Sequence, residues 1–351
     1  MNFHNRCINL NVAIPSSSLM DEETLRDKTI KISRFARAFS IFGVKKVFIY
    51  NDNKRRQYSV NKFKKNKHKN DLNIIGDESN ILKLILEYLD TPQYLRKALY
   101  PICNELKFAG LLDPIKSPHH KKKIPLDQIK EGDLRIGFLV NKADHKDFSK
   151  LRDRKMDNNS FNKRIRTDLS FKFPDDFRRV KFWHNKNNNQ TDMYVDIGLD
   201  YLIPFYGNND LVGQRVDIKI IGKYPNIKAV QAFKKDLENI YWGYKVSIVP
   251  SLDHIFRQED KNTFILLTSR KGGRFKDNEA RFKEFITHYD NLLIVFGSPT
   301  KGLDEIYPNI EQLATRKSCF YSNLFPNQHT ETIRLEEAVL GSLSILNYLL
   351  K

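Results

Sequence analysis

The chain has 351 residues, of which 40% are hydrophobic and 29% charged, so it has the length and composition of a globular protein rather than of a disordered one. Lysine and arginine number 60 against 42 acidic residues, and the net charge of +18 favours a nucleic acid or an anionic membrane surface as partner. No apolar run approaches the roughly eighteen residues of a membrane-spanning helix, and residues 1–18 lack a signal-peptide pattern. We therefore expect a cytoplasmic protein without a membrane partner.

The three cysteines, Cys7, Cys103 and Cys319, lie too far apart for a disulfide framework or a zinc pattern. The adjacent His119 and His120 have no second cluster of ligands to complete a metal site. The sequence therefore predicts a reducing compartment and no metal.

The first region, to about residue 125, predicts a strand at 8–14, a helix at 21–42 and a strand at 44–50. This order is typical of a βαβ unit in a parallel sheet. Residues 51–71 are basic and nearly free of aliphatic side chains, which predicts a mobile surface loop. A second helix is predicted at 79–91, before a proline. The spacing of apolar residues predicts that the two helices bury Leu25, Ile32, Phe35, Ala36 and Phe39, and Leu82, Ile85, Leu86 and Leu89.

The second region, residues 126–240, has short strand-like runs at 133–142, 193–205 and 214–224, separated by turn residues. A polar, basic stretch with interspersed aromatic residues lies between them, at 155–190. Several short strands in this length predict a small antiparallel β-barrel of the OB type, which often binds nucleic acid. A sandwich would give a similar pattern.

The third region returns to an α/β pattern, with apolar strands predicted at 262–270 and 291–299 and a helix between them. Continuous apolar strands are typical of a parallel sheet covered on both faces. We therefore expect an α/β domain built from residues 1–125 and 241–351, with 126–240 inserted as a separate domain.

Three predicted strands end in loops that could hold a ligand: "TSRKGG", "GSPTKGL" and "NLFPNQHT". The glycines of the first two loops, Gly272, Gly273, Gly297 and Gly302, allow close approach of a ligand and positive φ, although a single such loop is more often an ordinary turn. The absence of GxGxxG and GxxxxGK[ST] patterns argues against a dinucleotide or nucleoside-triphosphate fold.

The last of these loops runs directly into the closing helix. Thr330 and Thr332 can each act as its N-cap, and the glutamates nearby suit the helix dipole. Arg334 is unfavourable in a first turn and is better explained by a negative partner. The loop could therefore serve only as a cap or could hold a ligand.

Several motifs together resemble the RNA methyltransferases of the SPOUT (α/β-knot) superfamily, from about residue 8 to 347. They are "AIPSSSL", "FARAFSIFGVKKVFIY", "YLDTPQYLRKALYP", "AGLLDPIKSPHH", "YWGYKV", "VFGSPTKGLDEI" and "NQHTETIRLEEAVLGSL". The resemblance implies a Rossmann-like parallel sheet with a C-terminal trefoil knot, an OB-like insert and a homodimer with the site near the subunit interface. A topology argument alone would reject a knot.

The resemblance also implies S-adenosylmethionine as cofactor. It would be held by residues of the three loops, namely Ser269, Arg270, Gly297, Ser298, Gly302, Leu303, Asn323, Leu324, Phe325, Gln328 and Thr330. Where the family commonly has glycine, this chain has His329. If that position requires positive φ, the histidine would weaken cofactor binding.

The resemblance makes Arg34 and Arg334 candidates for stabilising a developing anion, and Glu331 a candidate proton acceptor. Glu331 could equally be only a capping residue. The proposed RNA contacts mix aromatic and basic side chains: Arg37, Tyr94, Arg96, Lys97, His119, His120, Lys121, Lys122 and Lys123. A solvated basic turn and a solvated helix face are the alternatives for the histidine–lysine segment and for the arginines of the first helix.

The expected function is therefore an S-adenosylmethionine-dependent RNA methyltransferase that modifies a nucleobase of ribosomal RNA, with a uridine ring nitrogen as the first choice. A non-catalytic RNA-binding or ribosome assembly factor on the same fold is the alternative. A DNA-binding regulator is disfavoured, because neither a helix-turn-helix nor a basic-zipper pattern is present.

Overall fold

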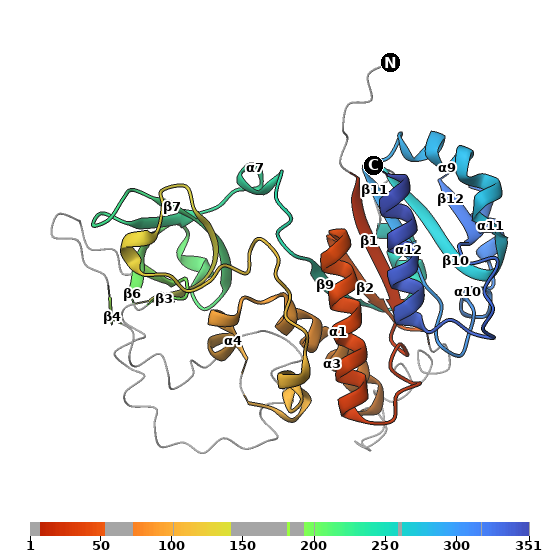
Figure 1. The fold of residues 1–351 in the computed structure, drawn as a ribbon, viewed down its shortest axis with the longest axis horizontal. Helices are drawn as coiled ribbons and strands as arrows, with labels where there is room; N and C mark the ends of the chain where they lie inside the picture. The colour runs from red at the N-terminus through yellow and green to blue at the C-terminus, as the bar shows by residue number, and fades with distance from the viewer. Residues whose placement is uncertain are drawn as a thin grey trace, which may run out of the picture. The chain divides into compact units, whose positions relative to one another are not determined.

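The structure is a computed structural model that describes residues 8–52, 73–100, 102–141, 181–182, 193–199, 201–258, 262–316 and 318–350. The chain forms two compact units, drawn in Figure 1. The first consists of Met1–Asp90, Asn104–Ile115 and Gly243–Lys351, and the second of Thr91–Cys103 and Lys116–Trp242. The second unit thus includes residues 91–103 and 116–125 in addition to the predicted insert.

A six-stranded parallel sheet forms the centre of the first unit, with the strand order β12-β10-β11-β1-β2-β9. The strands are β1 (Asn9–Pro15), β2 (Lys46–Tyr50), β9 (Lys245–Val249), β10 (Thr263–Arg274), β11 (Asn291–Val295) and β12 (Cys319–Asn323). The predicted parallel sheet and βαβ unit are confirmed, whereas β9 was not predicted. Because all strands are parallel, their carboxyl ends lie at one edge of the sheet.

Helices cover both faces of this sheet (Figure 1). One hydrophobic core contains residues of four helices: α1 (Leu25–Phe42), α3 (Asn73–Asp90), α9 (Glu279–Ile286) and α12 (Leu335–Leu349). The other core contains α8 (Leu252–Gln258), α10 (Leu303–Ile306) and α11 (Ile310–Ala314). Strand β1 serves both cores because its side chains alternate: Val12 and Ile14 lie in the first and Ala13 in the second.

The first helix follows its sequence pattern closely. Thr24 is its N-cap, accepting a hydrogen bond from the Asp27 N–H at 3.1 Å, and Gly43 ends it in the left-handed conformation at φ 71°. All of the predicted core residues of α1 and α3 are fully buried except Leu25, which is half-buried. In Figure 1, α1 and α12 lie side by side.

The second unit contains a closed β-barrel. Its strands are β3 (Leu134–Asn141), β5 (Met193–Asp196), β6 (Tyr201–Tyr206), β7 (Arg215–Ile221) and β8 (Lys228–Gln231). They pair in the order β6-β5-β3-β7-β8, and β8 pairs back to β6, which closes a five-stranded barrel. A short strand, β4 (Lys181–Phe182), also pairs with β6. The predicted small barrel is confirmed, and its assignment to the OB type stays a prediction.

Short helices complete the two units. Among the described residues of the second unit, the α-helices are α4 (Gln93–Leu99) and α7 (Lys234–Leu237). The described 3-10 helices are η2 (Asn104–Leu106), η3 (Ala109–Leu111), η4 (Leu126–Gln128), η7 (Asn209–Leu211) and η8 (Phe275–Asn278). Across the described ranges, no helix is long and apolar enough to cross a membrane. The predicted basic loop and the polar stretch at 155–190 fall almost entirely outside the described residues, and the trefoil knot stays a prediction.

Candidate active site at the carboxyl edge of the sheet

Three segments meet where strands β10, β11 and β12 end. Residues 269–272 are a bulge inside β10 rather than the loop expected there, because pairing with β12 stops after Thr268 and resumes at Gly273. We call them the β10 bulge. We call residues 296–302 the β11 loop and residues 324–334 the β12 loop.

Hydrogen bonds hold the three segments together. The Arg270 side chain of the β10 bulge donates to the Glu331 carbonyl in the β12 loop at 2.9 Å, and the Asn323 amide donates to the Arg270 carbonyl at 3.1 Å. The Lys271 ammonium donates to Asp304, just after the β11 loop, at 2.7 Å. This contact raises the pKa of Lys271 and lowers that of Asp304. The three predicted ligand loops therefore form one surface.

Glycine is needed here for close packing of backbone on backbone. A Cβ atom on Gly272 would lie 2.7 Å from the carbonyl carbon of Ser322, and one on Gly297 would lie 3.1 Å from the Lys301 carbonyl oxygen. Neither glycine has positive φ, so the conformational freedom expected from the sequence is not what these two positions use. These two positions require glycine because a larger side chain would collide with the neighbouring backbone.

The β11 loop is a tight turn organised by Ser298. Its hydroxyl accepts hydrogen bonds from the N–H groups of Thr300 and Lys301, at 3.2 and 2.9 Å, and its own N–H donates to the Lys301 carbonyl at 2.9 Å. Gly302 then caps α10, and the side chain of Leu303 is buried. Ser298 itself is half-buried.

The β12 loop has an apolar base and a polar rim. Leu324 is buried, and the Phe325 ring lies so close to Gly341 of α12 that a Cβ there would contact it at 2.8 Å. The Gln328 amide donates to the carbonyls of Thr330 and Glu331, at 3.0 and 3.2 Å. The loop therefore combines a buried apolar base with a polar rim closed by the hydrogen bonds of Gln328.

His329 is exposed and does not have positive φ. The strain expected from replacing a family glycine by histidine is therefore absent from this conformation, and the reason to expect weakened cofactor binding no longer holds.

The start of the closing helix differs from the sequence-based interpretation. Helix α12 begins at Leu335, so neither Thr330 nor Thr332 is its N-cap. Arg334 occupies that position, and its backbone N–H donates to the Glu337 carboxylate at 3.0 Å. Arg334 is thus placed before the first turn, and its guanidinium lies 3.6 Å from Glu22.

A buried charge cluster joins α1 to α12 at this helix end. Glu336 is almost fully buried, with one carboxylate oxygen 3.2 Å from Arg34 and the other 3.3 Å from Lys31. Lys31, also buried, contacts Asp21. The cluster fixes Arg34, whose side chain remains more than half exposed, next to the end of the β12 loop.

Sequence reasoning placed Lys31 in a solvated basic stripe and Glu336 among the glutamates that suit the helix dipole, and it missed that both are buried and paired. A signal was present, because Lys31 lies four residues before Phe35, and Glu336 three before Val339, each on the apolar face of its helix. Charged residues at such positions are rarely buried unless they are paired. Of the predicted catalytic residues, Arg34 contacts Glu336 in the first turn of α12 and Arg334 precedes that turn. Glu331 is exposed and contributes its carbonyl to the loop contacts.

The predicted RNA-contacting residues fall into two groups. Arg37 is exposed in the first unit, and its guanidinium donates to the Pro114 carbonyl at 3.2 Å. The second unit holds the rest, where Tyr94 and Arg96 donate to carbonyls at 2.7 and 2.9 Å and His119 is fully buried. Burial raises the pKa of Tyr94. His120 is half-buried, and the exposed members are Lys97, Lys121, Lys122 and Lys123.

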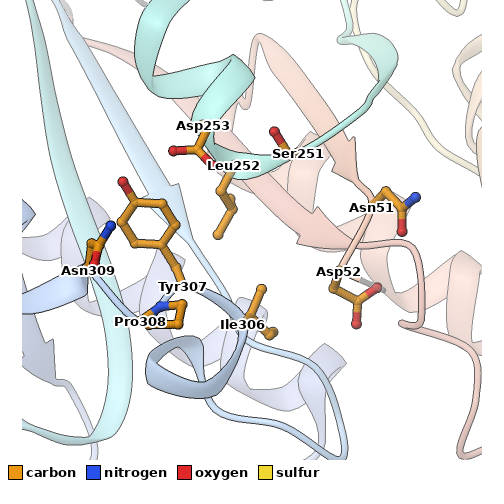
Figure 2. Close-up of a pocket in the computed structure, with 9 residues that line it drawn as sticks. All are labelled: Asn51, Asp52, Ser251, Leu252, Asp253, Ile306, Tyr307, Pro308 and Asn309. Atoms are coloured by element: carbon orange, nitrogen blue, oxygen red, sulfur yellow. The ribbon is translucent and has the colours of Figure 1, made fainter. Parts of the chain in front are cut away.

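A cavity of about 120 Å³ lies at the same edge of the sheet, beyond β2 and β9. Figure 2 shows Leu252, Ile306 and Tyr307 around it, with Asp52 on one side and Asp253 on the other. Burial and the neighbouring Asp253 raise the pKa of Tyr307. No lysine or arginine lines this cavity, so it offers acceptors for N–H and O–H groups and does not suit a phosphate. Within the part of the chain that the structure describes, no cluster of three or more His, Cys, Asp or Glu residues could hold a metal ion.

Comparison with known proteins adds an independent finding. Residues 9–346 match a protein family described as "Putative RNA methyltransferase". The chain is 27% identical over 354 residues to a Homo sapiens protein named "28S rRNA (uridine-N(3))-methyltransferase", covering 96% of this chain and 77% of the human protein. Proteins of the same name from Mus musculus and Drosophila melanogaster are 27% and 25% identical, over 96% of this chain in both cases and over 75% and 61% of their own lengths.

Proposed function

Since the chain belongs to the family described as "Putative RNA methyltransferase", and is by that membership an RNA methyltransferase, we propose that it methylates N3 of a uridine in ribosomal RNA. S-adenosylmethionine is the proposed methyl donor. The observation that carries the proposal is the convergence of the β10 bulge and the β11 and β12 loops on one surface, in a chain whose relatives bear the name uridine-N(3)-methyltransferase.

The cofactor would lie against the three loops. Backbone groups around Ser269, Ser298 and Gln328 would hydrogen-bond its polar atoms, and the half-buried Phe325, supported by the buried Leu324, would contact its adenine ring. The remaining predicted contacts, at Arg270, Gly297, Gly302, Leu303, Asn323 and Thr330, lie in the same three segments or directly beside them. When bound, S-adenosylmethionine supplies an electrophilic methyl group on a sulfonium.

The chemical task of the protein is to align uracil N3 with that methyl group and to manage one proton. The N3–H bond must break and the N3–C bond form while the methyl–sulfur bond breaks, which leaves S-adenosylhomocysteine. Orientation alone can contribute roughly 7–11 kcal/mol in a well-aligned site. Arg34 and Arg334, held by Glu336 and Glu22, would stabilise negative charge on the uracil oxygens. Glu331 or a water molecule would accept the proton.

The proposal extends to the rest of the assembly. The barrel insert, residues 126–240, would bind RNA together with Arg37 and the exposed lysines of the "SPHHKKK" segment. A cytoplasmic homodimer with a trefoil knot at the C-terminal end is part of the same proposal, since that architecture comes with the resemblance to the SPOUT enzymes.

The test is calorimetric titration with S-adenosylmethionine, followed by transfer of labelled methyl groups to ribosomal RNA and mass spectrometry of its nucleosides. The wild type should bind the cofactor saturably and produce 3-methyluridine. A Gly297→Ala, Thr330→Ala double variant should lose binding, whereas Thr287→Ala, after α9, should bind like the wild type. RNA binding without any cofactor binding would refute the proposal and favour the non-catalytic assembly factor.

A further inference from the structure

Three aromatic side chains are exposed on the barrel along strand β8 and its flanks. Tyr206, Tyr224 and Phe233 are exposed by 36%, 50% and 62%. Large aromatic side chains at these levels of exposure are candidates for binding another molecule. None of the three belongs to the RNA-contacting set predicted from the sequence. We call these residues, together with Lys228, the β8 track.

The strand register places these residues next to β8 or at its two ends. Tyr206 pairs with Val230 across β6 and β8, and the Lys228 ammonium lies over the Tyr206 ring, 5.2 Å from its centre. Tyr224 belongs to the hairpin between β7 and β8, next to the Ile221–Lys228 pair. Phe233 follows the other end of β8. The five residue steps from 228 to 233 span roughly 17 Å at about 3.3 Å each.

The alternation of side chains shows that Tyr206 and Lys228 face outward, while Tyr224 and Phe233 lie outside the strands and are assigned to the surface by their exposure. Phe205 and Ala229 belong to the barrel core and are fully buried, whereas their neighbours Tyr206 and Lys228 are not. Because consecutive side chains of a strand point to opposite faces, Tyr206 and Lys228 lie on the outer surface of the barrel.

Positive charge surrounds the aromatic residues. Lys223 in the hairpin and Lys234 and Lys235 in α7 are exposed. The acidic residues nearby include Asp236, which Lys219 contacts at 2.7 Å, and Glu238. Glu131 accepts a hydrogen bond from the Gly222 N–H of the hairpin at 3.2 Å, and Asp217 lies beside the end of β8, where its carbonyl accepts from the Ala232 N–H at 2.8 Å. Lys219, Lys228 and the three flanking lysines exceed these four acids by one, a small positive excess that complements a polyanion.

We propose that the β8 track is a binding surface for single-stranded RNA, on which bases stack against Tyr206, Tyr224 and Phe233 while Lys228 and the flanking lysines contact phosphates. The inference rests on the proposed function for the choice of RNA, and it assigns the residues by which the barrel holds the substrate. Unpaired bases are required, because bases inside a duplex cannot reach an aromatic platform on a protein surface.

The test is fluorescence anisotropy with a labelled, unstructured uridine-rich oligoribonucleotide at several salt concentrations. Alanine at Tyr206, Tyr224 or Phe233 should each weaken binding about 5- to 100-fold, the range for loss of one stacked base. Tyr206→Phe should retain affinity because the ring remains. Lys228→Gln should reduce the slope of log K against log salt by about 0.7, the value for one phosphate contact with a single strand.

Ile102→Ala is the matched control, because Ile102 is a fully exposed apolar residue of the same unit that lies outside the track. It should bind RNA like the wild type. Wild-type affinity in all three alanine variants would overturn the inference, as would equal binding of a perfect duplex RNA. Cofactor titration separates this outcome from failure of the proposed function, since the track variants should bind S-adenosylmethionine as tightly as the wild type.

Discussion

Asp196, at the end of β5 in the barrel, gives a prediction about stability and pH. Burial raises its pKa from 3.8 to about 6, although the Gly198 N–H donates to it at 2.8 Å and Lys123 is near. The folded state therefore binds this proton more tightly than the unfolded state does. By linkage, the free energy of unfolding must fall as the pH rises from about 4 to about 6.

The size of this effect follows from the two pKa values. A difference of roughly two pH units, at 1.36 kcal/mol each, gives about 3 kcal/mol of stability that is present in acid and lost above pH 6. Asp196→Asn keeps an oxygen for the Gly198 N–H and cannot titrate. The variant should gain up to about 3 kcal/mol over the wild type between pH 4 and pH 7.5.

Urea unfolding at a series of pH values measures this difference. Trp242 belongs to the second unit, where its indole N–H donates to Asp217 at 2.8 Å, so its fluorescence reports on that unit. Taking the difference between variant and wild type at each pH removes the contribution of all other titrating groups. A difference that stays constant from pH 4 to pH 7.5 would refute the reasoning.

Two further predictions concern the first unit. Gly272→Ala places a Cβ 2.7 Å from the backbone of Ser322, so we expect urea unfolding to show that the free energy of unfolding falls by about 1–3 kcal/mol. Gly273→Ala, whose Cβ would have no atom nearer than 3.9 Å, should change this free energy little. Equal losses in the two variants would contradict the packing argument. Lys31→Met leaves Glu336 buried without its lysine and should lower the free energy of unfolding by about 3–5 kcal/mol. In a double-mutant cycle, adding Glu336→Gln should restore part of this free energy. Strictly additive effects of the two substitutions would contradict the pairing.

Much of the first unit could be predicted because local patterns and tertiary contacts agree. Helix α1 has the apolar stripe that was predicted, and a threonine cap and a terminal glycine fix its ends. Strand β9 was missed because it is an edge strand whose exposed Lys245, Ser247 and Ile248 obscure the apolar pattern. Strand β8 was missed because four residues, two of them polar, give too short a signal.

The order of strands lies beyond such reasoning. Nothing in the local sequence of β12 says that it pairs with β10 on the side away from β11, and the placement of the three loops depends on that order. The same holds for the contact between Arg34 and Glu336, which lie 302 residues apart. Prediction from the sequence reached the loops through the rule that parallel strands end at one edge, and it could not reach the bulge in β10 or the charge cluster.

The two readings of the chain place different demands on its surface. A protein that only holds RNA needs a cationic surface with aromatic platforms, and the β8 track with its lysines meets that need within the barrel. A protein that only holds RNA does not need the β10 bulge, in which Gly272 permits backbone contact with β12. Nor does it need the buried Glu336, which holds Arg34 beside the same loops. Such a site costs stability, because burying Lys31 and Glu336 removes two charges from water. A stability cost of this kind beside the proposed cofactor loops favours the methyltransferase proposal over the non-catalytic alternative, which does not account for it.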